Sequence, residues 1–234
     1  MDDLIPIEIY PLILELEQKD LVTRTFRRLD PNHQRAIIAA ILAEAGERGP
    51  ALINIKRVAE RAEVSTGSLY QYFNSRQGLL DFAIELVVHT TTQSFGSTRP
   101  YFTEMTVAQA ISVYLAEGIA WSQAEAGFTR FFATAAYHGD PELGECVVRP
   151  IGVVLLDLIR TILTQGAERN EIRADLDLEA TVRVVNALLI AVGDAQLLPY
   201  LNTYYQLYGE DVPPERVMTA LFDFIKNGLG IKTV

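Results

Sequence analysis

Apolar residues recur at helical spacing along most of the chain. In HQRAIIAAILAEAGERGP (33–50), one helical face collects Ile37, Ile38, Ile41 and Leu42, and the Asp-Pro pair at 30–31 and the Gly-Pro pair at 49–50 bound the helix. The stretch NIKRVAERA (54–62) repeats the pattern behind Asn54, a good N-cap. A break at 63–64, a second start at Ser65 and a helix from about Arg76 into the 90s complete four predicted helices.

From residue 95 onward the predicted helices are longer, and Gly, Pro and Asp residues separate them. We expect them near residues 106–125, 127–138, 144–167, 178–200 and 214–228, with Gly228 as a C-terminal cap. Sustained two-residue alternation, the signature of strands, is nearly absent. The pattern therefore predicts an all-α fold, with a small N-terminal helical unit and a larger one behind it.

Charge distinguishes the two parts more sharply than helix length does. The 234 residues have a formal net charge of -10, yet residues 21–80 carry a net charge of +4. Residues 1–20 carry -5 and residues 81–234 carry -9. Only the segment 21–80 is therefore suited by its charge to a nucleic-acid partner.

Several other classes of protein are disfavoured by composition. No apolar run approaches the roughly 18 to 20 residues that cross a bilayer, and the N-terminal MDDLIPIEIY is acidic where a secretory signal is basic. The single cysteine, Cys146, allows neither an intramolecular disulfide nor a multi-cysteine zinc site. His89 and His138 have no partner at metal-ligand spacing. We expect a soluble cytoplasmic protein with no membrane association, no metal and no cofactor.

Residues 54–73 have the design of a helix-turn-helix, in which a first helix braces a second whose N-terminal end faces the major groove. Apolar residues occur where the two helices must cross, at Val58, Ala59, Ala62, Val64, Leu69 and Phe73. Ser65 is positioned to cap the second helix, and Thr66, Gly67 and Ser68 follow it with little side-chain bulk. Backbone N–H groups at this positive helix end could therefore approach DNA phosphates.

The segment NIKRVAERAEVSTGSLYQYFNSRQGLL (54–80) resembles the DNA-binding domain of the tetracycline-repressor (TetR) family of transcription regulators. The family pattern is a capped helix with Ile/Val-Ala in its middle, Ala-Gly-Val-Ser, Gly-Ser/Thr-Leu-Tyr, Tyr-Phe, a basic residue and a Leu-rich entry into the next helix. Glu63 departs from it, because the family usually has Gly there. We expect a residue at this position of the turn to adopt a positive φ, which costs a non-Gly residue about 1 kcal/mol.

The resemblance implies roles for individual residues of this segment. The residues expected at DNA are Asn54, Lys56, Ser65, Thr66, Gly67, Ser68, Tyr70, Gln71 and Arg76. Gln71 would reach either a base edge or a phosphate, and Arg76 stands where the family has a phosphate contact. Tyr72 and Phe73 would pack the helix against its neighbours. Arg57 and Arg61, taken singly, are interpreted as a solvated helix face.

The second half resembles the ligand-binding and dimerisation domain of the same family. GAERNEIRADLDLEATVRVVNALLIAVGDA (166–195) is similar to its Gly-x-x-x-Gly-Glu-x-Arg-x-Asp-x-Asp segment, with Asn170 where Gly is usual. In that family the last two helices of each subunit form a four-helix bundle with the partner. The residues expected at this homodimer interface are Leu188, Val192, Ala195, Val217, Leu221 and Phe224, and intramolecular core is an equally weighted alternative for each.

Aromatic residues gather where the family builds its effector cavity. Our candidates for binding a largely apolar small molecule are Trp121, Phe132, Tyr137 and Asp194. The first thirty residues exceed what the family needs, and LILELEQKDLVTRTFRRLDP reads as an extra amphipathic helix with Leu12, Leu16, Val22 and Phe26 as packing residues. Its Arg24, Arg27 and Arg28 would either follow DNA or lie on a solvated packing helix, and we favour the second.

These observations together predict three segments and one leading function. The segments are an N-terminal helical extension (1–30), a three-helix helix-turn-helix domain (31–78) and a helical ligand-binding and dimerisation domain (79–234). We expect that the chain is not an enzyme. We expect a sequence-specific DNA-binding regulator, namely a repressor that a small-molecule effector releases from a palindromic operator. The alternatives are an all-helical enzyme and an interaction module that does not bind DNA.

Overall fold

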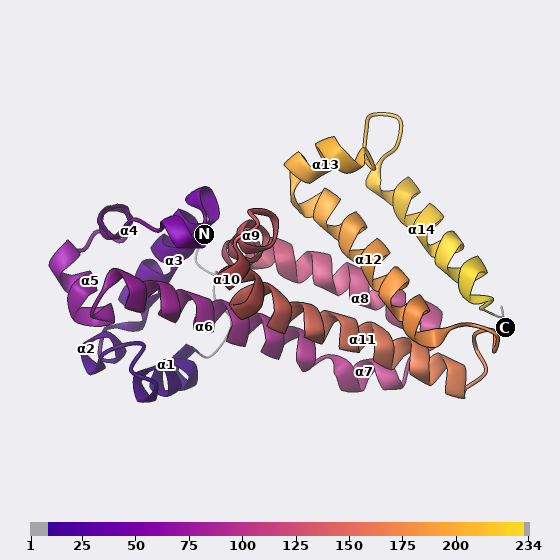
Figure 1. Cartoon of the computed structure of the whole chain (residues 1–234), viewed down its shortest axis with the longest axis horizontal. Helices are drawn as coiled ribbons and strands as arrows, with labels where there is room; N and C mark the ends of the chain where they lie inside the picture. The colour runs from indigo at the N-terminus through magenta and orange to yellow at the C-terminus, as the bar shows by residue number, and fades with distance from the viewer. Residues whose placement is uncertain (1–8, 232–234) are drawn as a thin grey trace. The chain divides into compact units, whose positions relative to one another are not determined.

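The computed structural model describes residues 9–231, and it is helical nearly throughout (Figure 1). Within that range the only β-type pairing is an isolated bridge between Gly209 and Val212. The predicted all-α fold is confirmed. None of the helices in residues 9–231 has the length and hydropathy that a membrane span requires.

The helices follow the sequence in short and long segments. Those up to residue 96 are α1 (Ile9–Gln18), α2 (Arg24–Arg27), α3 (Pro31–Arg48), a 3-10 turn (Pro50–Leu52), α4 (Ile55–Arg61), α5 (Thr66–Phe73) and α6 (Arg76–Gly96). They continue with α7 (Arg99–Thr103), α8 (Val107–Ala124), α9 (Ala126–Tyr137), α10 (Pro141–Leu143), a π-helical turn (Gly144–Val148) and α11 (Arg149–Glu168). The last three are α12 (Leu178–Leu197), α13 (Pro199–Tyr205) and α14 (Pro214–Leu229).

The chain forms two compact units. The first contains the residues up to Gln93 together with Ala124–Ile151, and the second contains Ser94–Gln123 and the residues from Gly152 onward. In the first unit α3 packs against α4 and α9, α4 packs against α5, and α5 packs against α2. A cluster of aromatic rings joins α2, α5 and α6, through Phe26, Tyr72, Phe73 and Phe82.

Capping side chains fix the starts of α3, α4 and α5, as the sequence predicts. Asp30 accepts a hydrogen bond from the N–H of Asn32 at the start of α3, and Asn54 and Ser65 cap α4 and α5. Between α4 and α5 the backbone turns at Glu63 with a φ of 55°, so this residue adopts the left-handed conformation anticipated for it. The turn thus forms without Gly.

The passage from α5 to α6 requires a specific residue that the sequence analysis did not single out. A Cβ atom on Gly78 would lie 2.1 Å from the carbonyl oxygen of Phe73. Asn74, just after α5, has a φ of 62°. Gly78 therefore allows the first turn of α6 to approach the end of α5 closely.

The N-terminal extension differs from the single helix expected for it. It forms two helices, α1 and α2, because the backbone reverses after Gln18 at Asp20, which has a φ of 58°. The four anticipated packing residues are all buried: Leu12, Leu16, Val22 and Phe26. The break lets α2 pack against α1.

The second unit contains α7, most of α8 and α11, and α12 to α14. Its core is built from buried aliphatic residues that include Leu115, Ile159, Leu163 and Leu189. Asp177 caps α12 by accepting from the N–H of Ala180. Helix α14 continues to Leu229 and ends at Gly230, which has a φ of 64°, so the expected cap at Gly228 was placed two residues too early.

Candidate functional site

Side-chain caps stabilise the N-terminal ends of both helices of the helix-turn-helix. The Asn54 Oδ1 accepts from the backbone N–H groups of Lys56 (3.0 Å) and Arg57 (3.4 Å). The Ser65 Oγ accepts from the backbone N–H of Ser68 at 2.9 Å. Each cap satisfies N–H groups that the first helical turn leaves without an intrahelical partner. Asn54 and Ser65 therefore stabilise the starts of α4 and α5, whatever else they contact.

The aromatic residues of α5 divide between its two faces. Leu69, Tyr72 and Phe73 are buried, and the Phe73 ring lies 5.0 Å from that of Phe82, centroid to centroid. Tyr70 is 46% exposed, and Gln71 is also exposed. The predicted division of α5 into an anchoring face and an outward face is confirmed.

The N-terminal end of α5 has little side-chain bulk and a solvent-exposed backbone. Gly67 is exposed, and Thr66 and Ser68 are half-buried. A Cβ atom on Gly67 would meet only the Ser65 Oγ, at 3.6 Å. Packing within the described chain therefore gives no reason for glycine here, whereas a partner approaching the backbone N–H groups would.

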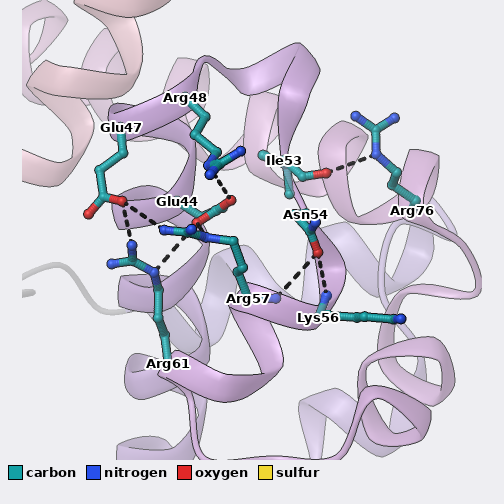
Figure 2. Close-up of polar contacts among 9 residues, drawn as sticks. All are labelled: Glu44, Glu47, Arg48, Ile53, Asn54, Lys56, Arg57, Arg61 and Arg76. Carbon is teal, nitrogen blue, oxygen red and sulfur yellow. Dashed lines mark hydrogen bonds and ion pairs between the residues drawn. The ribbon is translucent and has the colours of Figure 1, made fainter.

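A cluster of charged side chains joins α3 to α4 (Figure 2). The carboxylate of Glu44 is fully buried, and its Oε2 accepts from the Arg57 Nε at 2.9 Å and lies 3.5 Å from the Arg61 Nε. The Glu44 Oε1 lies 3.7 Å from the Arg48 Nε. The exposed Glu47 also pairs with Arg57 and Arg61. Hydrogen bonding to Glu44 and its charge raise the pKa of Arg57.

This cluster was not predicted from the sequence, although a signal existed. Glu44 follows Ile37 and Ile41 at helical spacing, so a carboxylate stands on the apolar face of α3. A buried carboxylate needs cationic partners, and α4 supplies them. Arg57 and Arg61 are therefore ion-paired with the two glutamates while their side chains remain 38% and 30% exposed, so they differ from the freely solvated helix face expected for them.

The two remaining basic candidates have different surroundings. Lys56 is exposed, makes no ion pair with the residues described, and extends away from the glutamates in Figure 2. The Arg76 guanidinium donates to the carbonyl of Ile53, at 2.9 Å from Nε, and to that of Ala51. Arg76 thus ties the start of α6 to the loop before α4 and keeps further N–H groups toward solvent.

A small cavity of about 120 Å³ lies in the second unit and contains the first of our ligand-binding candidates. Its aromatic wall is formed by Phe95, Phe102, Tyr114 and Trp121. Asp194 belongs to the same unit, and its negative charge adds to burial in raising the pKa of Tyr114. Phe132 and Tyr137 instead lie on α9, which belongs to the first unit and packs against α3. The structure therefore brings Trp121 and Asp194, but not the other two, into the unit with this cavity.

The candidate dimer residues on α12 and α14 also separate by burial. Val192, Ala195 and Leu221 are buried within the single chain, and Leu188 and Val217 are partly buried. Phe224 is 66% exposed, and Val184, which the sequence analysis did not name, is 58% exposed. Both line an apolar groove of about 270 Å³ between α12 and α14. Val184 lies one turn before Leu188, which is the signal that would have found it.

Metal binding receives no support from side-chain grouping in the part of the chain that the structure describes. No group of three or more His, Cys, Asp or Glu residues there is arranged to hold a metal ion.

A family model described as "Bacterial regulatory proteins, tetR family" matches residues 37–82 of the chain. No curated protein matches the sequence. Among solved structures, a TetR-family transcriptional regulator from Chloroflexus aurantiacus superposes with a TM-score of 0.60 at 17% identity, covering 88% of this chain and 97% of its own.

Two further solved structures contain a small molecule. FadR from Bacillus subtilis in complex with stearoyl-CoA has a TM-score of 0.57 at 16% identity and covers 83% of this chain and 98% of its own. The complex of SmeT with triclosan has a TM-score of 0.61 at 15% identity and covers 86% and 92%. At these identities the likeness establishes the fold over most of the chain, while the sequence match identifies the helix-turn-helix segment.

Proposed function

We propose that this chain, whose residues 37–82 belong to the tetR family of bacterial regulatory proteins, is a homodimeric repressor that binds a palindromic operator and is released by a small-molecule effector. One observation carries the proposal: α5 is anchored by its buried face and presents a capped, nearly bare N-terminal end to solvent. A helix end of this kind attracts phosphate through its free N–H groups and its positive dipole.

The proposed DNA contacts are of two kinds: phosphate contacts that position the helix and base contacts that read the sequence. The backbone of Thr66 and Gly67 and the short side chain of Ser68 would approach phosphates, with Lys56 as a further phosphate contact from α4. Tyr70 and Gln71, which point outward from α5, would extend toward the groove. Phosphate contacts fix the register of the helix, and base contacts supply sequence preference.

Effector control is proposed for the second unit. Its aromatic-walled cavity is suited to a small organic molecule, and the complexes of FadR with stearoyl-CoA and of SmeT with triclosan show that proteins of this fold take up such ligands. A ligand that binds one conformation more tightly than another shifts their populations. We propose that the shift changes the spacing of the two reading helices, so that they no longer fit successive major grooves.

Dimerisation is proposed through α12 and α14. The exposed Phe224 and Val184 border an apolar groove that water would cover in an isolated chain. Pairing of this face with the same face of a second copy would form a two-fold symmetric interface and cover the groove. A dimer matches the symmetry of a palindromic operator, and the site of action is then the cytoplasm, where the DNA lies.

A DNA-binding titration with paired variants tests the proposal. Labelled DNA from upstream of the chain's own gene is titrated with wild-type protein, Thr66→Ala and Tyr70→Phe, and Tyr101→Phe serves as control because Tyr101 is exposed in the second unit. We expect salt-sensitive binding by wild type and the control. The two α5 variants should lose affinity while sedimenting as the same dimer. No specific complex at low salt, or equal binding by all four proteins, would overturn the proposal and favour an enzyme or an interaction module.

A further inference from the structure

The cavity of the second unit combines aromatic walls with a carboxylate. Phe95 and Trp121 are in edge-on contact, with ring centroids 5.1 Å apart, and the rings of Phe102 and Tyr114 are 6.3 Å apart. Glu117 also lines this cavity and is solvent-exposed. Aromatic faces attract cations through their quadrupole, and a nearby carboxylate adds a direct attraction.

The charges around the cavity disfavour an anionic ligand. No Lys, Arg or His is among the described residues that line it, so nothing there pairs with a carboxylate or phosphate group. Burial, and then the negative charge of Asp194, raise the pKa of Tyr114, so a negative charge acts on this wall of the cavity. A buried negative charge without a partner is costly.

We infer that this cavity binds a small organic cation, a quaternary or protonated amine with apolar substituents, with Glu117 as the residue that sets the preference for positive charge. The volume of about 120 Å³ suits a head group of a few carbon atoms rather than a long chain. The inference rests on the proposed function only in treating the cavity as the effector site.

The chain contains a built-in probe for this cavity, because Trp121 is its single tryptophan. Tryptophan fluorescence is followed while choline is added, and separately while 3,3-dimethylbutan-1-ol is added. The two molecules have the same shape, but a neutral tert-butyl group replaces the trimethylammonium group in the second. Decanoate supplies the anionic comparison.

We expect choline to give a saturable change with a midpoint about tenfold or more below that of the neutral isostere, the size of a desolvated cation–π contact. Glu117→Gln should reduce this ratio to about threefold or less. Glu168→Gln, an exposed carboxylate of the same unit outside the cavity, should leave the ratio unchanged.

Three results would overturn the inference: tighter or equal binding of the neutral isostere, tighter binding of decanoate, or no response to choline. Operator binding is measured on the same preparations without any ligand. If the operator binds but choline shows no preference, the ligand class is wrong and the regulator stands. If the operator does not bind, the proposed function fails independently of the fluorescence result.

Discussion

The hydroxyl group of Thr23 donates a hydrogen bond to the backbone carbonyl of Gln71 at 2.8 Å, which connects the N-terminal extension to the outward-facing helix α5. The backbone N–H of Thr23 also donates to the carbonyl of Tyr72 at 2.9 Å. The last carbonyl groups of a helix lack intrahelical partners. The extension therefore satisfies two of them and holds the C-terminal end of α5.

Replacing Thr23 with Ala should destabilise the chain by about 1 kcal/mol, the net value of a neutral hydrogen bond. Because the lost bond supports α5, we also expect operator affinity to fall several-fold. Urea unfolding and DNA titration measure the two effects. Thr23→Ser keeps the hydroxyl group and should retain both properties. Weaker DNA binding by Thr23→Ser as well would show that the hydroxyl group is not what matters.

Gly67→Ala separates folding from DNA binding. Because the added Cβ meets only the Ser65 Oγ, at 3.6 Å, and Ala favours helix over Gly, stability should stay equal or rise by about 0.5 kcal/mol. If DNA approaches the backbone here, the methyl group should cost about tenfold in operator affinity, through a lost hydrogen bond to a charged group. Thermal unfolding and DNA titration are compared. Unchanged affinity would place the DNA elsewhere.

Glu44→Gln should destabilise the first unit by about 2 kcal/mol, because it leaves arginines around a buried site without their shared carboxylate. This expected loss of stability is smaller than that for a fully buried ion pair, because the arginine side chains are partly exposed. Glu47→Gln is the matched control, as Glu47 contacts the same Arg57 and Arg61 from the surface and should cost under about 1 kcal/mol. Chemical denaturation measures both. Equal effects would mean that burial of Glu44 adds nothing.

Glu125 gives the first unit a pH-dependent stability. Burial raises the pKa of this carboxyl group above 4.5. The folded chain then holds the proton to higher pH than the unfolded chain, so this contribution to stability is complete below pH 4.5 and is lost as pH rises through the raised pKa.

Glu125→Gln has no carboxyl group to ionise at this position, so it should not lose this stability as the pH rises. Its melting temperature should exceed that of wild type at about pH 8, and the difference should shrink as the pH falls toward that of the unfolded carboxyl group. Glu104→Gln, an exposed carboxylate in the second unit, should track wild type at every pH. A constant difference between Glu125→Gln and wild type across the range would contradict the assignment.

Local signals allowed much of this structure to be predicted. Helical periodicity and capping residues such as Asn54 and Ser65 act within a few positions, so the sequence displays them directly. The left-handed turn at Glu63 was anticipated from the family pattern. At Asn170, the other position where the family usually has Gly, the φ is also positive, at 58°.

What the sequence did not disclose depends on contacts between distant segments. The pairing of Glu44 with Arg57 and Arg61 needs α3 and α4 to be placed against each other first. The packing of α9 on α3 likewise removes Phe132 and Tyr137 from the unit that holds the aromatic cavity. Spacing along one helix reports which residues share a face, but not which helix that face meets.

Selection of binding sites from a pool of random duplex DNA tests the central claim most directly, because it requires no knowledge of the operator. Wild-type protein should enrich a two-fold symmetric sequence whose half-sites lie about one helical turn, or a multiple of it, apart. The Tyr70→Phe and Thr66→Ala proteins should enrich it weakly or not at all. Failure of the wild-type protein to enrich any sequence over the starting pool would contradict the assignment of α5 as a DNA-reading helix.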